Sequence, residues 1–147
     1  MDMDRPIGWT TLEESKELRK LGIDKGTNDL WYCKSYLPDY SLHKPMKNEK
    51  IISPLRITRS DIPAWSLGAL IATLPPYVIV YDKAGVCHDA FLKGMDGAVW
   101  YEYWDYEEEE SVKIWQVVEG LTITAVIRMV KFMLSHPDIL ETRTAHL

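Results

Sequence analysis

Apolar side chains recur at helical spacing in three segments, residues 11–21, 63–74 and 122–135. The first segment opens with a capping box formed by Thr11 and Glu14, and Gly22 provides its left-handed stop. The second begins at Pro63 and stops at a pair of prolines, which cannot continue a helix. The third is expected to be capped by Thr122, and its core stripe consists of Val126, Met129, Val130 and Met133.

Between the second and third helices the pattern changes to the alternation and β-branched or aromatic content of strands. The predicted strands are residues 77–82, 86–92, 98–106 and 112–118, separated by turns at 82–85 and 93–97. Residues 107–110 are all glutamate and are expected to form a solvated hairpin tip. On the third strand, one face should carry Val99, Tyr101 and Tyr103, and the other Trp100, Glu102 and Trp104.

Residues 27–61 are predicted to be a largely irregular arm. Residues 30–33 have the composition of a short strand, as have residues 51–57, but loop-forming residues separate them. An arm of this length inside a compact domain indicates a functional loop or a segment that packs on another subunit. The predicted fold is therefore a single α+β domain, residues 1–147, with an antiparallel four-stranded meander packed against two or three helices.

Charge and composition narrow the classes of partner. The chain has 147 residues and a net charge of -5, which argues against binding to the phosphate backbone of nucleic acids. No apolar stretch is long enough to span a membrane, and no signal peptide is visible, so neither a membrane partner nor export is expected. The two cysteines are distant and form no pair motif, which favours a reducing, cytoplasmic location.

No catalytic motif is visible in the sequence. Cys87-His88-Asp89 brings three potential metal ligands together, but neighbouring residues of a strand point to opposite faces, so no metal site is expected. Ser66 lacks the surroundings of a nucleophile and is expected to cap the second helix. Glycine-rich phosphate loops are missing, and no cofactor is expected. A hydrolase that uses His88, Asp89 or the glutamate run ranks last among the hypotheses because no spacing supports it.

A binding site is the favoured alternative to an active site. Arginine binds phosphate through two parallel hydrogen bonds, and aromatic faces stack on bases, so this residue set suits a nucleotide-like ligand. The same residues also fit a plainer interpretation, in which the arginines lie on the surface and the tryptophans in the core. The candidate ligand-binding residues are Arg56, Arg59, Trp65, Trp100, Tyr101 and Trp104.

Several segments resemble small proteins of bacteriophages and mobile elements of gut Bacteroidales. The resemblance rests on Glu14–Leu18, the Pro-Ala-Trp-Ser-Leu block at residues 63–67, Leu70–Pro75 and the 125–134 helix, and covers about two thirds of the chain as scattered anchors. The insertion around residues 40–52 and the glutamate-rich tip depart from it. That family has no assigned activity, so no catalytic residue carries over.

The resemblance implies a non-enzymatic accessory protein, acting against host defence in the host cytoplasm. One expected function is a molecular sponge, a homo-oligomer that sequesters a nucleotide-derived signalling ligand. The other is an inhibitor or adaptor that binds a host protein through exposed aromatic side chains and the acidic hairpin, residues 105–110. The acidic run is also compatible with a bound divalent cation or a merely solvated surface.

Overall fold

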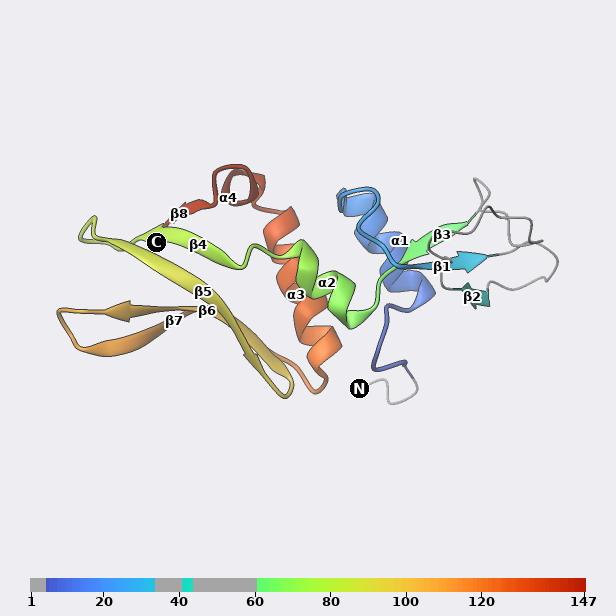
Figure 1. The fold of residues 1–147 in the computed structure, drawn as a ribbon, viewed down its shortest axis with the longest axis horizontal. Helices are drawn as coiled ribbons and strands as arrows, with labels where there is room; N and C mark the ends of the chain where they lie inside the picture. Colours follow the sequence, from blue (N-terminus) through green and yellow to red (C-terminus); the bar gives the residue numbers. More distant parts are fainter. Residues whose placement is uncertain (1–4, 34–40, 44–60) are drawn as a thin grey trace. The chain divides into compact units, whose positions relative to one another are not determined.

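A computed structural model describes residues 5–33, 41–43 and 61–147 (Figure 1). The chain forms two compact units, Asp2–Ile71 and Ala72–Leu147, here called the N-terminal and C-terminal units. Both helices and strands are present, which confirms the α+β class. None of the helices in the described ranges is long and apolar enough to span a membrane.

The N-terminal unit combines helix α1, Leu12–Leu21, with a small antiparallel sheet. The predicted capping box is confirmed: the Thr11 hydroxyl accepts the Glu14 N–H at 3.2 Å, and the Glu14 carboxylate accepts the Thr11 N–H at 2.8 Å. Gly22 ends the helix in the left-handed conformation, as expected. The sheet has the order β2-β1-β3, with strands β1 Leu30–Cys33, β2 Ser41–His43 and β3 Ile62–Ala64.

The predicted start of the second helix, Pro63, was wrong. Residues 62–64 form strand β3, which pairs with β1, and helix α2 begins only at Leu67 and ends at Thr73. Pro63 has no N–H to donate, and an edge strand tolerates this loss, so proline fits here without starting a helix. Ser66 caps the helix as predicted, since its hydroxyl accepts the Ala69 N–H at 3.1 Å.

The predicted arm, residues 27–61, contains more regular structure than expected. The predicted strand at residues 30–33 is confirmed as β1, and β2 was not predicted. The second strand predicted within the arm, residues 51–57, lies outside the described ranges.

The C-terminal unit is built on a five-stranded sheet with the order β7-β6-β5-β4-β8. Four of its strands form the predicted antiparallel meander, with somewhat shifted bounds. The prediction was incomplete, because a fifth strand pairs in parallel with β4 and makes the sheet mixed. The strands are β4 Tyr77–Tyr81, β5 Cys87–Met95, β6 Ala98–Asp105, β7 Glu110–Val118 and β8 Thr144–His146.

Helix α3, Thr122–Leu134, packs on β6 and β7, and its four predicted core residues are buried. A ring cluster joins sheet and helix: Trp115 lies 5.5 Å from Tyr101 and 5.4 Å from Phe132, measured between ring centroids. The predicted cap was wrong. Leu121 occupies the N-cap position of α3, and its side chain forms no capping hydrogen bond. The Thr122 hydroxyl instead accepts a hydrogen bond from the Gly97 N–H in the β5–β6 turn.

The last ten residues were not assigned from the sequence. They form strand β8 and all but the first residue of helix α4, Pro137–Thr142, and Arg143 joins the two in the left-handed conformation. Arginine at that position hides the usual glycine stop signal. β8 pairs with β4, which lies more than sixty residues earlier, so local pattern carries little information about it.

Candidate functional site

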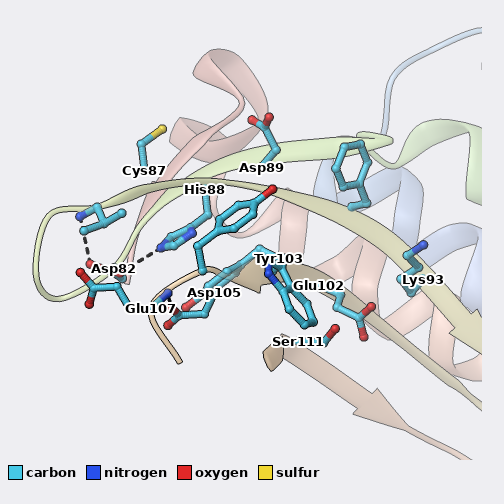
Figure 2. A pocket seen from close by; sticks show the side chains of 14 residues that line it. Asp82, Cys87, His88, Asp89, Lys93, Glu102, Tyr103, Asp105, Glu107 and Ser111 are labelled. Carbon is cyan, nitrogen blue, oxygen red and sulfur yellow. Dashed lines mark hydrogen bonds and ion pairs between the residues drawn. The ribbon is translucent and has the colours of Figure 1, made fainter. Parts of the chain in front are cut away.

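An open cavity of about 480 Å³ lies at the end of the C-terminal sheet where the acidic hairpin turns (Figure 2). Its lining comes from the β4–β5 turn, from β5, from β6 and its turn, and from Ser111 at the start of β7. This volume is within the range of small-ligand pockets. We call it the acidic pocket.

Carboxylates dominate the lining of the acidic pocket. Lys93 is the one lysine or arginine among its described lining residues. The carboxylates of Asp89 and Glu107 and the Lys93 amine form no hydrogen bond or ion pair within the described part of the chain. The lining carboxylates belong to Asp82, Asp89, Glu102, Asp105 and Glu107.

Aromatic rings form the apolar part of the same lining. Phe91 is 50% exposed, Trp104 46% and Tyr106 82%, so each offers a face or edge to solvent. Tyr103 also lines the pocket, but it is buried, and its ring stacks on His88. The pairing of β5 with β6 places Phe91 opposite Glu102, which brings an aromatic ring beside a carboxylate.

A hydrogen-bonded pair braces the pocket at the β4–β5 turn. His88 Nε2 lies 2.9 Å from the Asp82 carboxylate, and its ring stacks on Tyr103 with 4.2 Å between centroids. The other Asp82 oxygen accepts the N–H groups of Ala84 and Val86. The hydrogen bond from His88, followed by that from Val86, lowers the pKa of Asp82. Burial, reinforced by Asp82 and Asp105, raises the pKa of Tyr103.

His88 and its neighbours do not converge on one point. Figure 2 shows Cys87 and Asp89 on one side of β5 and His88 on the other, as the alternation of a strand requires. The exposed Cys87 thiol is therefore not directed at the imidazole. Within the described ranges, no group of three or more histidine, cysteine or acidic residues is arranged to hold a metal ion.

The tip of the acidic hairpin has an ordered turn. The Asp105 carboxylate accepts the N–H groups of Glu107 at 3.0 Å and Glu108 at 3.2 Å. Glu109 takes a positive φ of 51°, which closes the turn before β7. These contacts therefore hold the backbone of the turn that carries Tyr106 and the glutamates around it.

Four of the six candidate ligand-binding residues lie in the described part of the chain. Arg56 and Arg59 lie outside the described residues. Trp104 lines the acidic pocket. Trp65 is 1% exposed, and its indole N–H donates to the Thr27 hydroxyl in the N-terminal unit.

Trp100 and Tyr101 are placed as packed residues. Trp100 is 7% exposed, donates to Glu102 at 3.2 Å, and carries the Lys113 amine 4.2 Å above its ring. Tyr101 is fully buried, and its hydroxyl donates to the Pro75 carbonyl at 2.7 Å. The plainer interpretation, tryptophans in the core, therefore describes Trp65 and Trp100 but not Trp104.

Sequence reasoning missed Phe91 and Lys93 as parts of a site. Both share a face of β5 with Asp89, and this alternation was readable once the strand was predicted. The register that sets Phe91 against Glu102 was not readable, because the predicted β5–β6 turn was longer than the one observed. Comparisons with protein-family models, curated proteins and solved structures found no match.

Proposed function

We propose that this chain is a non-enzymatic protein that binds another protein by holding one of its basic, arginine-containing segments in the acidic pocket. The observation that carries the proposal is the lining itself: five carboxylates, one lysine and several aromatic rings line an open cavity. Of the two functions expected from the sequence, this is the inhibitor or adaptor. For a phage protein, as the resemblance implies, the target would be a host protein.

Electrostatics favours a cationic guest in this pocket. Clefts lined by one sign of charge focus the field and raise the local concentration of oppositely charged ligands. Asp89 and Glu107 are unpaired within the described residues, so a guest does not have to displace an internal partner. The same carboxylates would repel a phosphate. The nucleotide-derived ligand expected from the sequence therefore fits this pocket poorly.

The aromatic rings favour arginine within the basic class. A guanidinium stacks on aromatic faces and also forms two parallel hydrogen bonds to a carboxylate. Phe91 and Trp104 supply exposed rings, and Glu102 and Asp89 lie on the same two strands. Lysine, as a strongly hydrated point charge, would use only the carboxylates well.

The pocket is also preorganised for binding. The Asp82–His88 pair holds the β4–β5 turn, and Asp105 holds the turn of the acidic hairpin. Because these turns are already held, preorganisation reduces the cost of ordering them when a partner binds, which favours affinity. The hydrogen bond between Asp82 and His88 gives both side chains a structural role, which agrees with a binding function for the pocket.

The proposal is tested by fluorescence anisotropy with labelled peptides of about ten residues, rich in arginine, lysine or glutamate. We expect saturable binding of the arginine peptide, weaker binding of the lysine peptide, and none of the glutamate peptide. Replacing the opposing cation, Lys93→Gln, should strengthen arginine-peptide binding by about two- to fivefold, because a rim charge contributes about that much.

The matched control is Lys20→Gln, which makes the same change of net charge on an exposed residue of α1, outside the acidic pocket. Equal strengthening by both variants would mean that only net charge matters, and would overturn the pocket assignment. Absence of arginine-peptide binding to the wild-type protein would overturn the proposed function.

A further inference from the structure

A second cavity, of about 530 Å³, lies within the N-terminal unit, between the end of α1, the loop that follows it, and strands β1 and β3. We call it the N-terminal cavity. All its lining residues belong to that unit, so its assignment is independent of the function proposed for the acidic pocket.

Apolar rings contribute to the lining of the N-terminal cavity, and we call them its ring floor. Trp31 of β1 lies directly opposite Pro63 of β3 in the strand register, so the two share a face of the sheet. Trp65, two residues further, also lines the cavity and is held by its indole N–H, which donates to Thr27 at 3.0 Å. The loop is fixed in turn, since the Thr27 hydroxyl donates to the Asp24 carbonyl at 2.7 Å.

Two cations line the same cavity, and neither has a partner among the described residues. The side chains of Arg19 and Lys25 are exposed and form no hydrogen bond or ion pair with any described residue. Two acids also line the cavity: Asp24 is exposed, whereas Asp61 is buried and already engaged with a partner. Within the described ranges, the unpaired charges that line the cavity are therefore two cations and one anion.

We infer that the N-terminal cavity binds a mononucleotide. Its base would lie on the ring floor formed by Trp31 and Pro63, and its phosphate would be held by Arg19 and Lys25. Stacking on an aromatic ring contributes regardless of which base is present, and an arginine fork matches two phosphate oxygens. The N-terminal cavity would thus bind an anionic small molecule, whereas the acidic pocket would bind a cationic segment.

The test is isothermal titration of the full chain with AMP, adenosine and inorganic phosphate. AMP carries both the base and the phosphate, adenosine carries the base alone, and inorganic phosphate carries the anion alone. We expect AMP to saturate with a dissociation constant of about 1 mM or lower, and adenosine to bind about tenfold more weakly. The double variant Arg19→Gln, Lys25→Gln should bind AMP no better than adenosine, with its adenosine affinity unchanged.

Lys20→Gln is the matched control, because it removes a neighbouring exposed cation of α1 that does not line the cavity. It should leave AMP binding intact. AMP and adenosine binding equally well, undiminished AMP binding by the double variant, or no saturation by AMP would each overturn the inference. Failure here would leave arginine-peptide binding in place, since Arg19 and Lys25 are not part of the acidic pocket.

Discussion

The acidic pocket and the N-terminal cavity have similar volumes, about 480 and 530 Å³, and both have aromatic rings in their walls. They differ in the charges left unpaired. In the C-terminal unit the free groups include Asp89 and Glu107 against Lys93, whereas in the N-terminal unit they include Arg19 and Lys25 against Asp24. Volume and aromatic content alone would therefore predict the same ligand for both sites. The unpaired charges predict different ligands.

This comparison explains why counting residue types in the sequence pointed to a single nucleotide site. Arginines and tryptophans were grouped because the chain contains both, but the structure distributes the tryptophans between core and surface. Trp65 borders one cavity and Trp104 the other. Each ring acquires its ligand preference from the charges that the local strands bring beside it.

The largest effect should come from the turn that supports the C-terminal unit. A Cβ added at Gly97 would collide with the Glu119 carbonyl oxygen, and φ there is +76°. Gly97→Ala should lower the free energy of unfolding by about 3 kcal/mol or more, through backbone strain and this clash. Chemical denaturation, followed by intrinsic fluorescence, measures the loss.

Gly85→Ala is the control for Gly97→Ala, because Gly85 has φ +81° and open space around its Cβ position. It should cost about 1 kcal/mol from the left-handed conformation alone. Equal losses would show that the Glu119 contact is unimportant. A Gly97→Ala protein that loses arginine-peptide binding but still binds AMP would show that the two units fold separately, against the predicted single domain.

The next largest effect should come from charge reversal in the acidic pocket, which should change peptide binding but not AMP binding. The double variant Asp89→Lys, Glu107→Lys should weaken arginine-peptide binding by about a hundredfold, since like charges placed together cost several kcal/mol. Its AMP affinity should be unchanged. The control Glu108→Lys, Glu141→Lys has the same net charge but alters no residue of the acidic pocket, and a similar loss there would refute site-specific binding.

Loss of the exposed ring should have a smaller effect. Trp104→Leu removes the stacking surface and is expected to weaken the arginine peptide by about tenfold, as truncation of an aromatic anchor does. The lysine peptide should lose less, so the preference for arginine should shrink. Trp9→Leu removes a comparably exposed tryptophan from the N-terminal unit, and anisotropy should show the same peptide affinity as wild type.

The smallest effect concerns pH. The pKa of Asp82 is lowered in the folded protein, chiefly by His88, so its contribution to stability is complete above the pKa of the unfolded chain. That contribution is lost as pH falls through the lower folded-state pKa. Between about pH 5 and about pH 2, unfolding by urea should show that wild type and Asp82→Asn converge in stability. A constant difference between them would contradict the Asp82–His88 account.

Local signals predicted much of the fold. The capping box at Thr11 and the left-handed Gly22 act within a few residues, and both were predicted correctly. The meander was predicted because its strands are consecutive and joined by short turns. β3 and β8 were missed because each is three residues long and exists by pairing with a distant strand, which outweighs local propensity.

The candidate site was predictable only in part. The acidic run and Trp104 were both singled out from the sequence, because consecutive glutamates and alternating rings are visible there. That Phe91 and Lys93 join them depends on strand register, and a shift of one residue would have moved both to the other face. The burial of Trp65 and Trp100 depends on tertiary packing, which composition does not encode.

Binding of a basic segment in the acidic pocket is tested most directly by backbone and indole NMR shifts during titration with the arginine peptide. We predict that the largest shifts fall on Phe91, Lys93, Trp104 and Ser111, from three neighbouring strands of one sheet. Shifts should be small at Glu13 and Glu141, which are acidic and exposed but do not line the pocket. Shifts spread evenly over all exposed acidic residues would contradict the account and show attraction by net charge alone.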